Sequence, residues 1–401
     1  MKKNSQEDSL DSSKTYKDLI IITSRFPYPL EKGDKLRVYH QIRHLSKYFK
    51  VHLISTPDNV VKSKHKKQLE PYCESINIFQ INVFQKIGGL LYSLLTNKPF
   101  QVGYFYHFGI HRKIKKLLHV IEPDHIYCQL IRSAEYVKDY HDCHKTIDYM
   151  DAFSKGMERL SQSNKGLKRF LYNSEAKRLV NYENTIFDYF ENHTIISNQD
   201  QKHIFHKDND SITIIPNGID DSFLNYEKEV EKDCDIIFIG SMSYSPNIAA
   251  AKYIVNDILP LLPTNTKVKI SGANPSRQVL KLASENVDIT GFLEDIKAAY
   301  KSAKIFVAPM FLSVGLQNKL LEAMALGLPC ITTSLSNNAI QAEPNKEILI
   351  ANSPQEFKEK ISVLLNDEEL YNRLQKNATQ FVKENYDWNK ITHRLVTILN
   401  D

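Results

Sequence analysis

The chain of 401 residues carries 52 lysines and arginines against 47 aspartates and glutamates, a formal net charge of +5, with 42% hydrophobic and 25% charged residues. These totals are typical of a folded globular protein, and the length favours two domains over a single hydrophobic core. The mild positive charge suits an anionic small molecule or an anionic membrane surface, and it is too weak to indicate nucleic-acid binding.

The cysteines and the apolar runs indicate the cellular compartment of the protein. The five cysteines are scattered with no C-x-x-C pair, which favours reduced thiols over a disulfide scaffold. Residues 1–17 are polar and lack the apolar stretch of a signal peptide, so we expect a flexible tail. The longest apolar run, residues 87–95, is far shorter than the roughly 20 residues that span a bilayer. We therefore expect a cytoplasmic protein with, at most, peripheral contact on the inner face of the membrane.

The first half of the chain alternates β-branched runs with amphipathic segments. Residues 18–23 are expected to form a buried strand, residues 35–49 a helix with apolar side chains at helical spacing, and residues 51–55 the next strand. Strand, helix, strand is the opening of a parallel sheet. Further strands are predicted at residues 75–81, 124–129, 145–150, 193–197 and 212–216, with a long charged helix at about 172–191.

A turn-forming run at Pro216, Asn217 and Gly218 interrupts this pattern, which then restarts. Strands are predicted at residues 234–240, 268–272, 287–291, 304–309, 329–333 and 347–351, and a last helix at 386–399 with Trp388 in its first turn. The sequence thus predicts two doubly wound α/β domains joined near residue 216. In such sheets ligands bind beyond the carboxyl ends of the strands, so a cleft between the two domains is the expected site.

Residues 314–330 combine a strand end, a glycine loop and a short amphipathic helix. Asn318 is expected to cap this helix, because its side-chain oxygen can accept a first-turn N–H. The free N–H groups and the positive end of the helix dipole form an anion site, to which Lys319 adds a full positive charge. One turn further, the Glu322 carboxylate can accept two hydrogen bonds from a ribose diol. Diphosphate plus ribose describes a nucleotide-activated donor.

The same two charges also fit a plainer interpretation, an i,i+3 surface pair that contributes about a few tenths of a kcal/mol. The glycine in the preceding loop, Gly315, the position after a strand, and the apolar residues 323–329 argue against a solvated face. We therefore favour the ligand interpretation.

Several motifs together resemble retaining glycosyltransferases of family 4, close to an exopolysaccharide-associated subgroup with a GIQNKVLEAMA-like element. The most specific motif is GLQNKLLEAMALGLPCITT, and the others are RFPYPLEKGDKLRVYHQIRHLS, IDYMDAFS, FIGSMSYSPN, VDITGFLEDI and YDWNKI. The resemblance spans about residues 18–400.

This resemblance implies the GT-B fold, in which two Rossmann-like domains face each other across a cleft. It assigns a tail to residues 1–17, an acceptor-side domain to 18–215, a nucleotide-sugar-binding domain to 216–384, and a helix that crosses back to the first domain to 385–401.

The resemblance also implies roles for individual residues. Glu322 is expected to bind the donor ribose, and Lys319 to stabilise the departing diphosphate. The other expected donor-binding residues are Gly33, Arg37, Ser241, Phe292, Leu293, Gly315, Gln317, Asn318 and Leu320. Two departures stand out. The first acid of the family's usual E-x7-E pair falls on Val314, and the segment after FIG, SMSYSPN, lacks the usual basic residue.

Candidate acids elsewhere have competing explanations. Asp151 can face the reacting sugar or the acceptor, or it can cap the helix that follows it; Asp148 is a weaker candidate for the same role. The D-x-D patterns at residues 208–210 and 233–235 are expected to be solvated turn and strand-end residues. We predict no metal and no resident cofactor.

Two of three other segments allow two interpretations. Residues 111–119, HRKIKKLLH, fit an anionic lipid surface or lipid-diphosphate acceptor as well as an ordinary charged helix face. Residues 62–68 are expected to be solvated. The aromatic run at residues 99–109 can shape an acceptor cleft or be a loop packed over the core.

We therefore expect a glycosyltransferase that moves a sugar from a nucleoside-diphosphate donor to a glycan or lipid-linked acceptor in cell-envelope or exopolysaccharide synthesis, with retention of configuration. The alternatives are a GT-B-fold sugar-nucleotide epimerase and a non-catalytic nucleotide-sugar-binding subunit. The sequence predicts no partnership with nucleic acid.

Overall fold

The structure is a computed structural model that describes residues 16–312 and 315–400. The chain divides into two compact units. Unit 1 holds the residues up to Asp148, Lys177–His193 and the residues from Val396, and unit 2 holds Tyr149–Ala176 and Thr194–Leu395. Each unit is described by itself below.

The first sheet has seven strands in the order β3-β2-β1-β4-β5-β6-β7. The strands are β1 (Asp18–Thr23), β2 (Lys50–Ser55), β3 (Ser75–Ile78), β4 (His125–Gln129), β5 (His144–Met150), β6 (Asn192–Ile195) and β7 (Thr213–Ile214). Neighbouring strands such as β1 and β2 pair in parallel. Leu19, Ile20, Ile21 and Ile22 of β1 are all fully buried, which is why this strand is continuously apolar: helices cover both faces of a parallel sheet.

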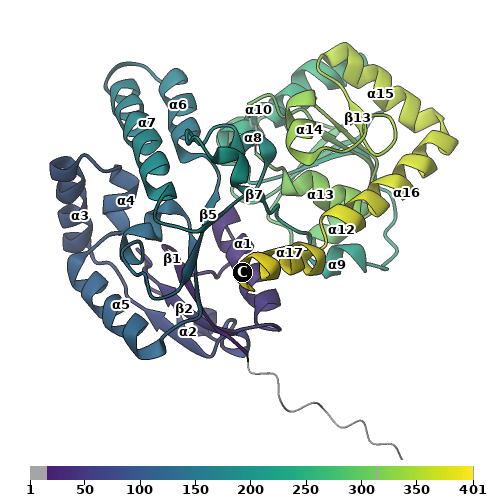
Figure 1. The fold of residues 1–401 in the computed structure, drawn as a ribbon. Helices are drawn as coiled ribbons and strands as arrows, with labels where there is room; N and C mark the ends of the chain where they lie inside the picture. Colours follow the sequence, from purple (N-terminus) through teal and green to yellow (C-terminus); the bar gives the residue numbers. More distant parts are fainter. Residues whose placement is uncertain (1–15, 313–314, 401) are drawn as a thin grey trace, which may run out of the picture. The chain divides into compact units, whose positions relative to one another are not determined.

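The helices around the first sheet follow the strand–helix alternation. They are α1 (Gly33–Leu45), α2 (Ser63–Lys66), α3 (Val83–Thr96), α4 (Phe100–Phe105), α5 (Phe108–Ile121), α6 (Phe153–Gln162), α7 (Gly166–Phe187) and α8 (Asn198–Gln201). Figure 1 shows α3, α4 and α5 on one side of the first sheet and α1 on the other. The aromatic run at residues 99–109 is helical, forming α4 and the start of α5, and it is not the loop that was one of the expected alternatives.

The second sheet has six parallel strands in the order β10-β9-β8-β11-β12-β13. They are β8 (Cys234–Ile239), β9 (Val268–Ser271), β10 (Val287–Gly291), β11 (Ala303–Ala308), β12 (Cys330–Thr332) and β13 (Leu349–Ile350). Counted from its first strand, each sheet begins in the order 3-2-1-4-5-6, the doubly wound order of dinucleotide-binding folds. The prediction of two doubly wound α/β sheets is confirmed.

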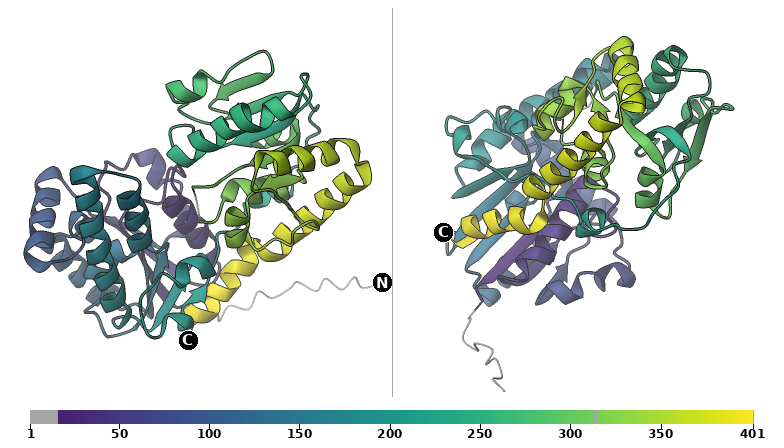
Figure 2. Two further views of the ribbon diagram at one scale, coloured as in Figure 1. Left: turned by 90° about the horizontal axis from the view of Figure 1, so that it is seen from above. Right: turned by 90° about the vertical axis from the view of Figure 1, so that its right-hand side faces the viewer.

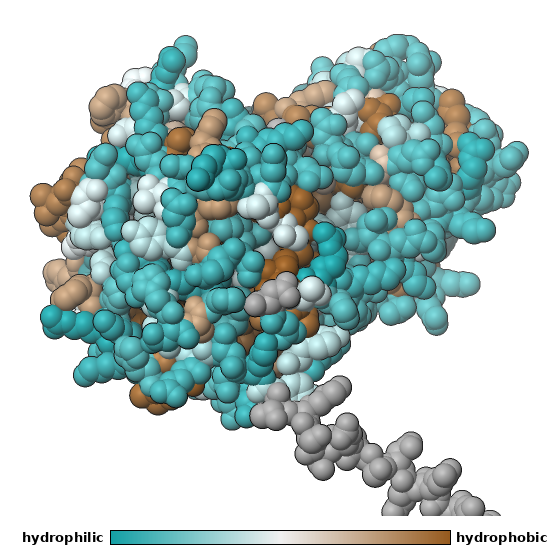
Figure 3. All heavy atoms as spheres, viewed as in Figure 1, coloured by the Kyte–Doolittle hydropathy of each residue, from teal (hydrophilic) through white to brown (hydrophobic). Residues whose placement is uncertain are grey.

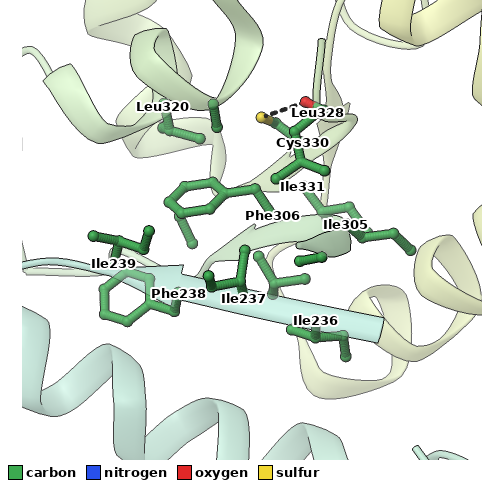
Figure 4. Close-up of a cluster of buried hydrophobic side chains, with 14 of the residues drawn as sticks. Ile236, Ile237, Phe238, Ile239, Ile305, Phe306, Leu320, Leu328, Cys330 and Ile331 are labelled. Atoms are coloured by element: carbon green, nitrogen blue, oxygen red, sulfur yellow. Dashed lines mark hydrogen bonds between the residues drawn. The ribbon is translucent and has the colours of Figure 1, made fainter. Parts of the chain in front are cut away.

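The last helix, α17 (Trp388–Asn400), contacts the first sheet: Asn192 of β6 donates to the carbonyl oxygen of Ile398 at 3.3 Å, and Arg394 donates to that of Ile214 in β7 at 2.8 Å. The helices of the second sheet are α9 (Asp221–Leu224), α10 (Ser245–Tyr253), α11 (Arg277–Leu280), α12 (Ile296–Lys301), α13 (Asn318–Ala325), α14 (Ser334–Ile340), α15 (Pro354–Asn366) and α16 (Glu368–Asn385). The further views in Figure 2 show helices layered on this sheet. Its core joins Phe238 of β8, Phe306 of β11 and Leu320 of α13 (Figure 4). Burying this apolar surface fixes α13 on the sheet.

No helix within the described residues is long and apolar enough to cross a lipid bilayer.

Candidate functional site

The candidate site lies in unit 2, where the strand order of the second sheet reverses. β8 and β11 are hydrogen-bonded neighbours whose following helices, α10 and α13, start at the same edge. At such a switch point the two connections diverge and leave room for a ligand beyond the strand ends. Ser241, which follows β8, is exposed there.

Two glycines allow close packing of the backbone and of Asn247 at this edge of the sheet. A Cβ on Gly272, whose φ is +141°, would lie 1.7 Å from the carbonyl oxygen of Gly240, and a Cβ on Gly240 would lie 2.6 Å from the amide nitrogen of Asn247. Any side chain at either glycine would therefore push the strand ends or Asn247 out of place.

Lys319, in the first turn of α13, reaches across to the other connection. Its Nζ donates to Asn247 Oδ1 at 2.8 Å and to Gln317 Oε1 at 3.2 Å, and lies 5.5 Å from the centre of the Phe238 ring. Asn247 in turn donates to the carbonyl oxygen of Ser241 at 3.0 Å. The ammonium is thus fixed between the ends of β8 and β11 by neutral amide oxygens.

This arrangement leaves the Lys319 charge poorly compensated. Burial lowers the pKa of the lysine to about 8, while the nearby Glu322 carboxylate opposes the shift. Desolvation disfavours the charged form of a lysine unless an anion approaches it. The site therefore favours an anionic ligand at Lys319.

The N-terminus of α13 reinforces this preference. Gln317 occupies the N-cap position with no side-chain cap, because its amide donates to the carbonyl oxygen of Gly315 at 2.7 Å. Asn318 is the first helical residue, so the expectation that it caps α13 is wrong. Its buried Oδ1 has no hydrogen-bond partner among the described residues. The N–H groups of this turn are not covered by a side-chain cap, as an anion site requires.

Glu322 lies one turn further along α13 and is held by Tyr300. The Tyr300 hydroxyl lies 2.8 Å from Glu322 Oε2 and 3.2 Å from the carbonyl oxygen of Lys319. Burial raises the pKa of Glu322, and Tyr300 and Lys319 oppose the shift. One carboxylate oxygen thus fixes the side chain, which leaves the other to accept from a ligand hydroxyl.

The remaining predicted donor-binding residues of unit 2 differ in how exposed their side chains are. Phe292 is 76% exposed just after β10, and Leu293 packs partly against the core. Gly315 has open space where a Cβ would be. The Leu320 side chain is fully buried, so this residue can offer only its backbone. Val314 lies outside the described residues.

Two residues that organise the site were not among the predicted site residues. They are Asn247 and Tyr300. Each contacts α13 from a distant part of the sequence. The signal for Asn247 is its place in the first turn of α10, seven residues after the strand-end glycine Gly240; nothing in the local sequence marks Tyr300.

In unit 1, Arg37 points into the interior and not toward an open ligand site. It is 0% exposed, and its Nε and Nη2 donate to the Asp148 carboxylate at 2.6 and 3.1 Å. Because this pair neutralises itself inside the unit, we do not carry Arg37 into the donor site. Gly33 begins α1 and is exposed. Arg25 pairs with Asp34 at 2.7 Å.

Asp151 follows β5 at a sharp turn of the backbone. Met150 before it has a φ of +62°, which a residue with a side chain rarely adopts. Ala152 occupies the N-cap position of α6, so Asp151 lies one residue before it. Its candidate role at the reacting sugar stays a prediction.

The acids of the second D-x-D pattern are paired with lysines. Asp233 contacts Lys269 at 2.7 Å, and Asp235 contacts Lys304 at 2.8 Å. Within residues 16–312 and 315–400, no group of three or more His, Cys, Asp or Glu side chains is arranged to hold a metal ion.

Comparison with known proteins defines the class. Residues 233–367, within unit 2, match the family described as "Glycosyl transferases group 1". The fold matches that of the Anabaena protein HepE, solved in complex with UDP and glucose, with a TM-score of 0.67 and 15% identity over 95% of this chain and 99% of that chain. The chain therefore has the GT-B fold and is an enzyme of the glycosyltransferase class.

Two curated proteins are related along the sequence. An uncharacterized 44.6 kDa protein in the cps region of Klebsiella pneumoniae is 24% identical over 396 residues, covering 93% of this chain and 97% of that protein. The Campylobacter jejuni GalNAc-alpha-(1->4)-GalNAc-alpha-(1->3)-diNAcBac-PP-undecaprenol alpha-1,4-N-acetyl-D-galactosaminyltransferase is 27% identical over 168 residues, covering 40% of this chain and 46% of that protein.

Proposed function

We propose that the chain transfers a sugar, with retention of configuration, from a nucleoside-diphosphate donor to a glycan or lipid-linked acceptor in cell-envelope or exopolysaccharide synthesis. The observation that carries this proposal is Lys319, a half-buried ammonium fixed by neutral amides beside an uncapped helix N-terminus. The relatives support the choice of pathway, since one lies in a cps region and another acts on an undecaprenol-linked glycan.

In this proposal the donor diphosphate lies between the start of α13 and Lys319, and its ribose hydroxyls donate to Glu322. Ser241, Gly315, Gln317 and the backbone of Leu320 line the phosphates and sugar, while Phe292 and Leu293 flank the base. The Asn318 amide, with its buried partnerless oxygen, is available to a sugar or phosphate hydroxyl.

Charge stabilisation supplies the catalysis. As the bond from the anomeric carbon to the diphosphate breaks, negative charge grows on the leaving oxygen. Lys319 and the N–H groups of α13 are already oriented toward that charge and need little reorganisation. The acceptor hydroxyl attacks on the side that the diphosphate leaves, and its proton passes to the diphosphate. Asp151 is proposed to orient the acceptor or sugar, and Gly33 to let the backbone approach the diphosphate.

The proposed enzyme needs no metal, because Lys319 and the helix N-terminus meet the diphosphate charge that a divalent cation would otherwise meet. We place it in the cytoplasm, where nucleotide sugars are found, with peripheral contact to the anionic inner face of the membrane. The exposed lysines and arginine of α5 suit that contact.

A thermal-shift screen tests the donor site. UDP, GDP, ADP and CMP are each added to the wild type and to Lys319→Ala and Glu322→Ala. We expect at least one nucleotide to raise the wild-type melting temperature, because ligand binding to the folded state stabilises it, and each substitution to reduce that shift. Lys281→Ala and Glu285→Ala, exposed residues of the same types in unit 2, are matched controls that should respond like the wild type.

Two results would reject the proposal at different levels. If no nucleotide stabilises the wild type, the donor site itself is rejected. If one does and the two site variants respond like the controls, Lys319 and Glu322 are wrongly assigned.

A second candidate, nucleotide-sugar binding without transfer, is favoured by Val314, which stands where the family's first acid is usual. The two are separated by Val314→Glu. If the wild type binds donor without transferring or hydrolysing it while Val314→Glu does either, the wild type is a binding subunit.

A further inference from the structure

The helix α3 of unit 1 has its large apolar side chains on the outside. Exposed apolar residues recur along one stripe at helical spacing: Val83, Phe84, Ile87, Leu91, Leu94 and Leu95. Phe84 is 85% exposed and Leu95 is 89% exposed. Figure 3 shows apolar side chains gathered at the margin of the molecule where α3 lies in Figure 1.

The inward face of α3 carries small residues instead. Gly89 and Ser93, one turn apart, are its buried positions. A Cβ on Gly89 would lie 1.9 Å from the carbonyl oxygen of Gly103 in α4, and the Ser93 hydroxyl donates to the carbonyl oxygen of Pro99 at 3.0 Å. A helix of a water-soluble protein normally buries its large apolar side chains. In α3 this arrangement is inverted.

The neighbouring helix α5 has the ordinary arrangement. It buries Ile110, Ile114 and Leu118 and exposes Arg112, Lys113, Lys115 and Lys116. The two helices start beside each other, since Gln85 Nε2 of α3 lies 3.4 Å from Nδ1 of His107, the N-cap of α5. The start of α3, with its exposed apolar stripe, therefore lies beside the start of a helix that exposes cations.

The charge along this segment of the sequence has one sign. Residues 83–121 contain six lysines and arginines and no aspartate or glutamate, although the whole chain has nearly equal numbers of both. An exposed apolar patch marks a binding surface for protein or membrane. Lys98 pairs with Glu135, and the four exposed cations of α5 favour an anionic occupant. A helix that lies in the bilayer interface has this combination of an apolar face and adjacent lysines and arginines.

We propose that α3 lies in the interface of an anionic lipid bilayer, with its apolar stripe among the acyl chains and the α5 cations at the lipid phosphates. With 14 residues, α3 is about 21 Å long, which suits a helix lying along the surface and not one crossing it. This extends the peripheral membrane contact proposed above and names the inserting element, but it does not depend on the donor-site residues.

The test is co-sedimentation of the full chain with vesicles. One set contains phosphatidylcholine only, and the other contains phosphatidylcholine with 30% phosphatidylglycerol, a mixture chosen on the order of a bacterial anionic surface charge. We expect the wild type to bind the anionic vesicles at least about tenfold more tightly than the neutral ones, with binding weakened by salt.

Three variants separate the parts of the surface. Phe84→Ser/Leu91→Ser/Leu95→Ser should lower partitioning to anionic vesicles at least about tenfold, because three exposed apolar side chains leave the lipid. Lys113→Gln/Lys116→Gln should lower it a few-fold and reduce its salt dependence. Leu280→Ser/Val363→Ser, which changes exposed apolar residues of unit 2, is the matched control and should bind like the wild type.

The proposal fails if the wild type does not sediment with anionic vesicles, or if the α3 variant sediments as the wild type does. It also fails if the wild type is a dimer in solution that the α3 variant converts to a monomer, because a second copy then covers α3. An unchanged melting temperature, and an unchanged response to the nucleotide identified in the screen, show that the α3 variant is folded. If none of the four nucleotides binds but the vesicle results hold, the donor site fails and the membrane surface stands.

Discussion

The two parallel sheets begin with the same strand order, but a cation beside each of them is compensated in a different way. In unit 1, the Arg37 guanidinium lies fully buried and makes two hydrogen bonds to the Asp148 carboxylate. In unit 2, the Lys319 ammonium is held by the amide oxygens of Asn247 and Gln317. The first charge is matched by a carboxylate, and the second is oriented without being matched.

This difference separates a structural cation from one that awaits a ligand. In a buried ion pair with complementary geometry, each charge is compensated by the other. Removing one partner leaves the other as an uncompensated buried charge. Neutral dipoles fix the position of a cation without neutralising its charge, so the cation can still bind an anionic ligand. Doubly wound topology therefore tells where a ligand can bind, and the chemistry of the cation's partners tells which unit uses that position for an anion.

The largest expected effect is the loss of the Arg37 pair. Arg37→Ala should lower the free energy of unfolding of its unit by about 3–5 kcal/mol, because Asp148 is left as an uncompensated buried charge. Urea denaturation measures this loss. The double variant Arg37→Met/Asp148→Leu removes both charges and should recover most of it. If Arg37→Ala is as stable as the wild type, the Arg37–Asp148 pair does not stabilise the fold, and the proposed difference between Arg37 and Lys319 is wrong.

Lys319→Met should reduce nucleotide binding without reducing stability. Nucleotide affinity should fall at least about tenfold, equivalent to about 1.4 kcal/mol, while the melting temperature without nucleotide stays equal or rises, because a desolvated charge is removed. Isothermal titration with the nucleotide identified in the screen gives the affinity. A variant that loses stability and keeps affinity would place Lys319 in the same structural category as Arg37.

The pH dependence of binding follows from the lowered pKa of Lys319. With a pKa of about 8 in the free protein, the lysine is charged below pH 8 and loses its proton above it. Nucleotide affinity should thus be level from about pH 6.5 to 7.5, where the nucleotide's own ionisation is nearly complete, and then fall by up to about tenfold per pH unit above 8. Lys319→Arg keeps its charge and should show no fall up to pH 10. A wild type without that fall contradicts the lowered pKa.

The same shift has a defined sign for stability. Since the folded pKa of Lys319 lies below its unfolded value of 10.5, the folded state binds fewer protons than the unfolded state between about pH 8 and 10.5. The contribution of this lysine to stability therefore increases as pH rises through that window.

The smallest effect is expected from substitutions of Asn247. One of them, Asn247→Asp, would give Lys319 a carboxylate partner like the one that Arg37 has. Asn247→Ala removes one neutral hydrogen bond and should weaken nucleotide binding by about 1 kcal/mol, or roughly fivefold. Asn247→Asp gives Lys319 a carboxylate partner like that of Arg37, so the pKa of Lys319 should rise and the competing anion should weaken binding further. If Asn247→Asp binds nucleotide more tightly than Asn247→Ala, charge compensation is not what distinguishes the two units.

Local sequence patterns were sufficient for the fold and for one wall of the site. Buried β-branched runs such as residues 18–23 predict strands, and their alternation with helices predicts doubly wound sheets. Lys319 and Glu322 are three residues apart, so helical geometry alone places them in the first turns of α13.

The parts that escaped prediction depend on contacts between distant residues. Arg37 lies close to Gly33 in sequence, which made it look available to a ligand, but its partner Asp148 is 111 residues away. Tyr300 and Asn247 are 22 and 72 residues away from the α13 residues that they contact. The apolar residues of α3 form a pattern that could equally face a core, and only the close packing of Gly89 on Gly103 shows which side is inward.

The lowered pKa of Lys319 also gives this residue a distinct reactivity. At pH 8 about half of its side chains are the neutral amine, whereas an ordinary lysine with a pKa of about 10.4 is below about 1% neutral. Only the neutral form attacks an aldehyde or an activated ester. A small anionic aldehyde should therefore label Lys319 ahead of the other lysines it can reach, and occupancy by a nucleotide should protect it, so the residue can report donor-site occupancy by mass spectrometry when no acceptor is known.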